Sequence, residues 1–106
     1  MELDLEQAVT DGIDRLDAFY PEWPNEIDID KLDMANGGRC IIGQLFGDYL
    51  DGINTLGLDF FSEDDISHGF NLPQGEDGPA PSTVWRELTD LWIAEIKEIR
   101  ESIKGE

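Results

Sequence analysis

The chain of 106 residues has room for one hydrophobic core, so we expect a single acidic domain over residues 1–106. Its 25 acidic residues against 7 basic ones give a formal net charge of −18, which excludes a basic surface that grips nucleic acid or an anionic membrane. The 40% share of hydrophobic residues, with three Trp and five Phe, is too high for a disordered acidic tail.

The first helix and the connection behind it are predicted from periodicity and from proline. Apolar residues recur at helical spacing on one face of residues 3–20, and Pro21 and Pro24 end this amphipathic helix. Residues 21–39 then form a long irregular connection, whose spaced apolar residues predict an ordered segment laid over the core. Within it, residues 27–34 alternate apolar and acidic side chains as a strand does. No partner strand is predicted, so the state of this segment stays open.

The most apolar segment runs from Cys40 to about Leu56 and predicts a long central helix. A glycine costs about 1 kcal/mol in a helix interior relative to alanine, so the glycines here need a packing reason, or else the helix is broken there. On one side of this helix we expect a stripe of small residues that a neighbouring backbone could approach closely. The stripe consists of Cys40, Gly43, Gln44 and Gly47.

Three further elements complete the prediction. A capping box at residues 62–65 predicts a short helix, and Gly69 ends it in the left-handed conformation. Residues 71–82 hold three of the five prolines and predict a mobile surface loop. Apolar residues at intervals of three and four predict a long last helix over residues 82–104. The fold class is therefore all-α, a small bundle of three long helices and one short helix.

The composition and motifs argue against catalysis and against a leader segment. The first twenty residues hold neither a basic segment nor a continuous apolar run, so we expect no signal peptide and a cytoplasmic protein. Cys40 and His68 are the only residues of their types, which excludes an internal disulfide and a Cys-pair zinc site. The acidic run 28–33 lacks the glycine and glutamate spacing of a calcium loop. Without a catalytic motif, we predict no enzyme, no cofactor and no metal.

Most of the negative charge lies in the N-terminal part of the chain. Residues 1–81 hold 19 acidic and 3 basic residues, a net of −16, whereas residues 82–106 hold 6 and 4, a net of −2. Such a surface attracts basic proteins at raised association rates. In its sharpest form it mimics nucleic acid, with carboxylates standing where phosphates would. The alternative is that the charge serves only solubility. The candidate interaction surface comprises Asp4, Asp11, Asp14, Asp28, Asp30 and Asp64.

Two other hypotheses stay open. One is a small ligand-binding or redox protein organised around Cys40 and Gln44, although a lone cysteine beside glycines is more often a packing residue. His68, the only partner for a nucleophilic Cys40, is expected at a helix end with its ring in solvent. The other hypothesis is a structural homodimer through the helix over residues 82–104, with Ile93 in or near the contact, because this side chain projects away from the apolar stripe.

Several motifs follow one another through the middle of the chain, ahead of a last helix that carries Trp85 and Trp92. They are Leu32-Asp33, Cys40-Ile41-Ile42-Gly43-Gln44-Leu45-Phe46-Gly47, Leu56-Gly57-Leu58 and Gly69-Phe70. Over about residues 13–100 this pattern resembles a group of small uncharacterised proteins of actinobacteria and their phages. The resemblance implies a phage or actinobacterial setting and carries over no catalytic or binding residue. In that setting we expect an accessory factor that binds and modulates a basic protein in the cytoplasm of the host cell.

Overall fold

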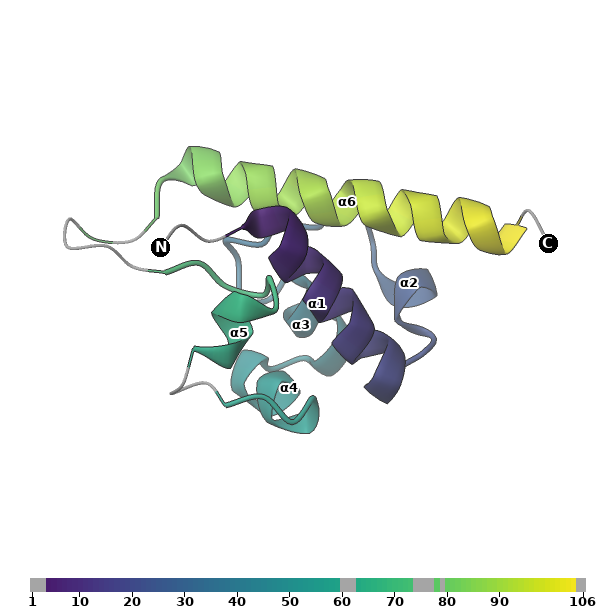
Figure 1. The fold of residues 1–106 in the computed structure, drawn as a ribbon, viewed down its shortest axis with the longest axis horizontal. Helices are drawn as coiled ribbons and strands as arrows, with labels where there is room; N and C mark the ends of the chain where they lie inside the picture. The colour runs from purple at the N-terminus through teal and green to yellow at the C-terminus, as the bar shows by residue number, and fades with distance from the viewer. Residues whose placement is uncertain (1–3, 60–62, 74–77, 79, 105–106) are drawn as a thin grey trace.

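The computed structural model describes residues 4–59, 63–73, 78 and 80–104. In this part of the chain there is no β-strand, and the prediction of an all-α fold is confirmed (Figure 1). The helices are α1 (Leu5–Phe19), α2 (Trp23–Glu26), α3 (Ile41–Phe46), α4 (Tyr49–Thr55), α5 (Asp64–Ser67) and α6 (Ser82–Lys104). Two of them are long and four are short, in place of the three long helices and one short helix that we expected.

Helix α1 buries one face, as its periodicity predicts. Asp4 caps it, because the carboxylate accepts a hydrogen bond of 3.1 Å from the backbone N–H of Gln7. Its buried residues are Ala8, Val9, Gly12 and Leu16. At Gly12 the chain after α5 approaches so closely that a Cβ atom would clash with the carbonyl oxygen of His68 and lie 3.0 Å from the ring of Trp92. This position therefore requires glycine.

The prediction of one long central helix is wrong, because the helix is broken at Gly47 into α3 and α4. Gly47 has a φ of 80°, the left-handed conformation that ends helices, and Asp48 then caps α4 through the N–H of Asp51. Helix α4 folds back onto α3 at Gly52, where a Cβ atom would clash with Ile42 and approach the Phe46 ring to 2.7 Å. One glycine thus breaks the helix and another allows the two halves to pack.

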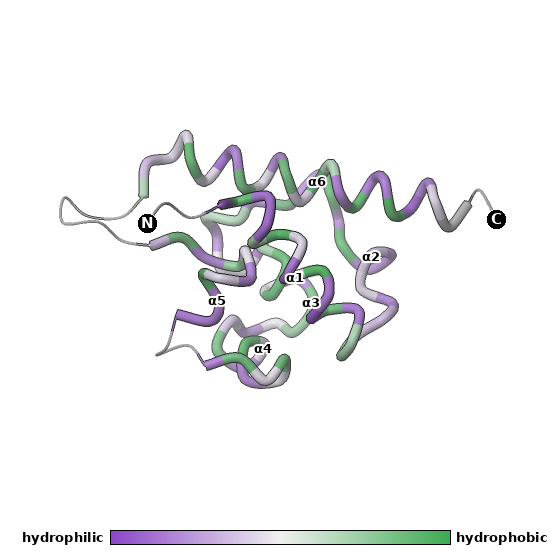
Figure 2. The backbone as a smooth tube through the Cα atoms, in the orientation of Figure 1, coloured by the Kyte–Doolittle hydropathy of each residue, from purple (hydrophilic) through white to green (hydrophobic). Residues whose placement is uncertain are grey.

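Three aromatic side chains form the centre of the core. Trp92 of α6 stacks on Phe70, with ring centroids 5.5 Å apart, and meets Trp23 of α2 edge to face at 6.0 Å. Both buried indoles are satisfied, since the N–H of Trp92 donates to the Gly69 carbonyl at 2.7 Å and that of Trp23 to the Asp17 carboxylate at 2.8 Å. Figure 2 shows α6 alternating between hydrophobic and hydrophilic residues, as a helix with one buried face does.

The connection over residues 21–39 contains the short helix α2 and is otherwise made of turns. Residues 27–34 form no strand. The connection is fixed to α6 at two points. The hydroxyl of Thr89 accepts a hydrogen bond of 3.0 Å from the N–H of Met34, and the Arg100 guanidinium donates to the carbonyls of Pro24, at 2.7 Å, and Ile27. Arg100 therefore joins the connection to α6.

Helix α5 ends as predicted, with Gly69 at a φ of 75°. Ser62 of the predicted capping box lies outside the described residues, and the N-cap position is taken by Glu63 at a φ of 63°. Residues 74–77 and 79 of the loop predicted to be mobile also lie outside the described residues.

Candidate interaction surfaces

The outward side of α1 is lined by carboxylates, and we call it the α1 acidic face. The buried residues of α1 lie on the opposite side of the helix, so these acids project away from the core, apart from Asp17, whose carboxylate accepts the hydrogen bond of the buried Trp23 indole. Asp4, Glu6, Asp14 and Asp17 are exposed and Asp11 is half-buried. The one basic residue of α1, Arg15, is turned to its own chain: it lies 5.7 Å from the Phe19 ring centroid and donates to the Leu56 carbonyl at 3.5 Å.

The carboxylates of the α1 acidic face form no ion pair with the basic side chains that the structure describes. Among the described residues, with Asp59 set aside, no carboxylate lies within 4.0 Å of a basic side-chain nitrogen. Internal ion pairs would cancel the field of these carboxylates at a distance. Their absence here leaves the α1 acidic face free to act on charged molecules in solution.

The six predicted surface acids do not gather in one place. Asp4, Asp11 and Asp14 lie on α1, and Asp64 begins α5, where it accepts a hydrogen bond of 2.8 Å from the N–H of Asp59. Asp28 and Asp30 lie in the connection, where the Asp28 carboxylate accepts from the N–H of Asp30 at 3.1 Å. The α1 residues thus form the densest part of the predicted surface. The α1 acidic face also contains two acids that were not predicted, Glu6 and Asp17, so that its members are Asp4, Glu6, Asp11, Asp14 and Asp17.

The predicted small-residue stripe is divided by the fold. The Cys40 sulfur caps α3 by accepting a hydrogen bond of 3.3 Å from the N–H of Gly43, and a Cβ atom on Gly43 would clash with the carbonyl oxygen of Gly37. The turn before α3 is therefore the backbone that approaches closely. Gly47 stands apart, because it ends α3 and has no atom within 4 Å of a Cβ position.

Cys40 and Gln44 are both engaged by their own chain. Cys40 is 1% exposed, and burial raises the pKa of its thiol. The Gln44 amide donates to the carbonyls of Asp28 at 3.2 Å and Arg39 at 2.9 Å, while its oxygen accepts from the N–H of Asp28 at 2.7 Å. These contacts favour a packing and clamping role for both side chains over ligand binding or redox chemistry.

His68 is half-buried, which differs from the expected ring in solvent. Its Nδ1 lies 2.7 Å from the carbonyl oxygen of Asp64, and the ring lines a shallow pocket of about 350 Å³ together with Asp11, Asp14 and Arg15 of α1. The described residues contain no group of three or more His, Cys, Asp or Glu side chains able to hold a metal ion. The structure thus gives His68 a packing contact with α1.

Sequence reasoning missed a buried polar network between α4 and α5. Asp65 is 1% exposed, and its carboxylate accepts hydrogen bonds from the Tyr49 hydroxyl at 2.7 Å, the Asn71 amide at 3.0 Å and the N–H of Ile66 at 3.0 Å. Burial and the contact with Asp65 raise the pKa of Tyr49. The sequence signal was a tyrosine on the apolar face of the segment from Cys40 to Leu56, since Asp65 itself resembled the solvated acids around it.

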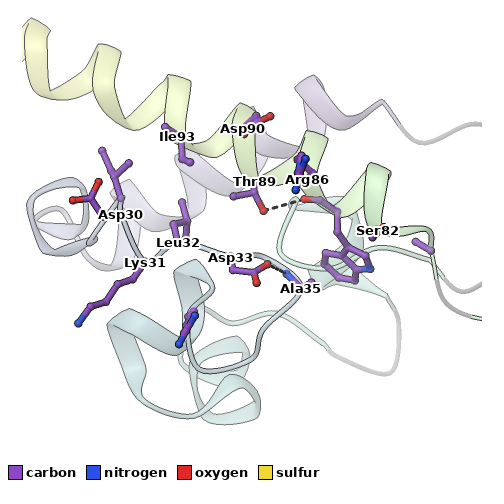
Figure 3. Close-up of a pocket in the computed structure, with 14 residues that line it drawn as sticks. Asp30, Lys31, Leu32, Asp33, Ala35, Ser82, Arg86, Thr89, Asp90 and Ile93 are labelled. Carbon is purple, nitrogen blue, oxygen red and sulfur yellow. Dashed lines mark hydrogen bonds between the residues drawn. The ribbon is translucent and has the colours of Figure 1, made fainter.

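A second surface is an open groove between residues 29–39 and the first half of α6, with a volume of about 980 Å³ (Figure 3). We call it the α6 groove. Leu32, Trp85 and Ile93 contribute to its apolar lining. Ile93, which was expected to project away from the apolar stripe of its helix, is half-buried in this groove. The charged lining residues are Asp30, Lys31, Asp33, Arg39, Arg86 and Asp90. Its two walls are about fifty residues apart in the chain, so no local pattern reveals it.

No family model, no curated protein and no solved structure matches this chain. A search of the described residues found no helix with the length and apolar character needed to cross a membrane. The function of the protein is therefore inferred from the α1 acidic face and the α6 groove.

Proposed function

We propose that this protein is a binding module for a basic protein, and that the α1 acidic face is the surface that binds. The observation that carries the proposal is the set of carboxylates on the solvent side of α1, none of which is paired with a basic side chain of the described residues. Unpaired charge of one sign steers a partner of the opposite sign and raises its association rate.

The length of the α1 acidic face supports a partner that binds nucleic acid. Asp4 and Asp17 are thirteen residues apart, which is about 20 Å along the helix at 1.5 Å per residue. One strand of DNA carries a phosphate about every 3.4 Å, or about six over the same length. Five carboxylates over this length approach that charge density, so a basic groove that holds a phosphate backbone can accept α1 in its place.

The resemblance to proteins of actinobacteria and their phages indicates the setting. In it, the protein is a non-enzymatic accessory factor that acts in the cytoplasm of a bacterial host and modulates a basic, nucleic-acid-binding host protein. The protein occupies the partner's basic groove, and this competes with the nucleic acid that the partner normally holds. The competing explanation, acidity for solubility alone, predicts no preference for any one face of the molecule.

The experiment compares two variants with the same change in charge. In the test variant, Glu6→Gln, Asp11→Asn and Asp14→Asn neutralise three acids of the α1 acidic face. In the matched control, three exposed acids of α6 are neutralised, namely Glu87→Gln, Glu98→Gln and Glu101→Gln. Each protein is immobilised and exposed to lysate of an actinobacterial host at low salt, and the retained proteins are identified.

The proposal expects a basic nucleic-acid-binding protein on the wild type and on the control, eluted by added DNA or by about 0.5 M salt, where screening is strong. The test variant should lose it. Equal loss from both variants would show that net charge alone matters, and retention that DNA cannot displace would refute the mimicry.

A further inference from the structure

The α6 groove differs from the rest of the surface in its charge. Its charged lining consists of three acidic and three basic residues, so its formal charge is zero in a chain of −18. Lys31, Arg39 and Arg86 are three of the seven basic residues of the whole protein. A surface that serves only to attract basic partners has no use for cations. Cations gathered beside apolar side chains therefore indicate that this groove has a different role.

Charge balance bears directly on which molecules can meet this surface. Two copies of a chain with a charge of −18 repel each other over most orientations, and like charges placed opposite each other cost affinity. A face with no net charge is where that repulsion is smallest. The half-buried side chains of Trp85 and Ile93 supply apolar area at the same place.

The charge order of this face is self-complementary. The α6 groove runs along the first half of α6, so a two-fold pairing can bring the α6 helix of each copy against the groove of the other. Arg86 and Asp90 are both exposed and stand one helical turn apart on α6. When two such helices pack antiparallel about an axis midway between these residues, each Arg86 faces the Asp90 of the other copy.

We propose that a second copy of this chain occupies the α6 groove, in a two-fold dimer that pairs the two α6 helices antiparallel through Arg86 and Asp90. The pairing uses residues 29–39 and the first half of α6, because one helix strip alone falls short of the roughly 1,200 Å² that a specific interface buries. Salt screens the repulsion between the two negatively charged copies. The association constant of this dimer therefore increases with salt concentration. Binding of a basic partner to the α1 acidic face weakens with salt, so the two proposals fail separately.

The test is sedimentation equilibrium of the full chain up to about 1 mM, a concentration that detects even a weak dimer. The mass should rise from 11.9 kDa toward twice that value as salt increases from about 0.1 to 1 M, over which the Debye length falls from about 10 to 3 Å. Arg86→Glu and Asp90→Lys should each lower the association constant by about tenfold or more, because each places like charges opposite each other.

The double variant with Arg86→Glu and Asp90→Lys exchanges the two charges and should restore the dimer. Glu87→Lys is the matched control, since it changes the net charge as much as Asp90→Lys does at an exposed neighbouring position outside the groove. A monomer at every salt concentration overturns the proposal and leaves the groove to a different occupant. Dimerisation that Asp90→Lys and Glu87→Lys strengthen alike, or that the double variant does not restore, also overturns it.

Discussion

The buried hydrogen bond between Tyr49 and Asp65 predicts a specific loss of stability in Tyr49→Phe. This change removes only a hydroxyl that donates to a carboxylate at 2.7 Å, and it keeps the ring. Hydrogen bonds to charged groups contribute about 1.5–3 kcal/mol, so the free energy of unfolding should fall by about 2 kcal/mol. With a urea slope of about 1–1.5 kcal/mol per molar for a small domain, the midpoint should move by about 1.5 M.

The matched control is Tyr20→Phe, because the Tyr20 hydroxyl also donates to a carboxylate, that of Glu26 at 3.2 Å, but at an exposed site. Water replaces such a bond, so its loss should lower the free energy of unfolding much less than Tyr49→Phe does. Urea unfolding followed by tryptophan fluorescence measures both variants, since Trp23 and Trp92 are buried in the core. Equal losses in the two variants would refute the assignment of Tyr49 to a buried, stabilising network.

The raised pKa of Tyr49 adds a dependence on pH to the same prediction. The folded state favours the protonated hydroxyl, whereas an unfolded tyrosine ionises near its ordinary value of 10.0. The stabilisation is therefore fully present below about pH 10 and decreases at higher pH, by up to about 1.4 kcal/mol per pH unit. Between pH 10 and about pH 11.5 the wild type should lose more stability than Tyr49→Phe. Parallel curves for the two proteins would contradict the raised pKa.

Two further predictions concern the glycine contact and the cysteine. Gly12→Ala places a Cβ atom against a backbone carbonyl and should lower the free energy of unfolding by about 3 kcal/mol, whereas Gly37→Ala, with nothing within 4 Å, should change it by less than about 0.5 kcal/mol in the same urea assay. The buried Cys40 thiol should react with a disulfide reagent about a hundredfold more slowly in the native protein than after denaturation. Fast native reaction would revive the redox hypothesis.

The long helices α1 and α6 could be predicted because periodicity is a local property. The short ones depend on neighbours. We interpreted Pro24 as part of the end of the first helix, yet it lies in the first turn of α2, where proline is also favoured. Gly47 could either pack tightly inside a helix or break it. It breaks the helix, because α4 folds back onto α3 and packs against it at Gly52. A single sequence does not show that contact.

The candidate surfaces also differ in how far the sequence predicts them. The acids on α1 could be assigned to one face from the helical wheel alone, because the helix fixes their directions. The sequence does not distinguish Asp30 and Asp65 from these acids. Asp30 nevertheless lines the α6 groove, whereas the Asp65 carboxylate is buried and accepts hydrogen bonds from three other residues. Their environments come from contacts between distant segments, and the acidic residues around them give no sign of the difference.

The two proposals become coupled if both hold. No residue of α1 lines the α6 groove, so a dimer formed through this groove leaves both α1 acidic faces exposed. A partner with one short basic site then binds each copy independently. A partner with an extended basic surface contacts both copies and gains affinity from the second contact, by about 10² or more where the geometry allows it. Arg86→Glu, which keeps every carboxylate of α1, should weaken binding of the extended partner and leave that of the short one unchanged.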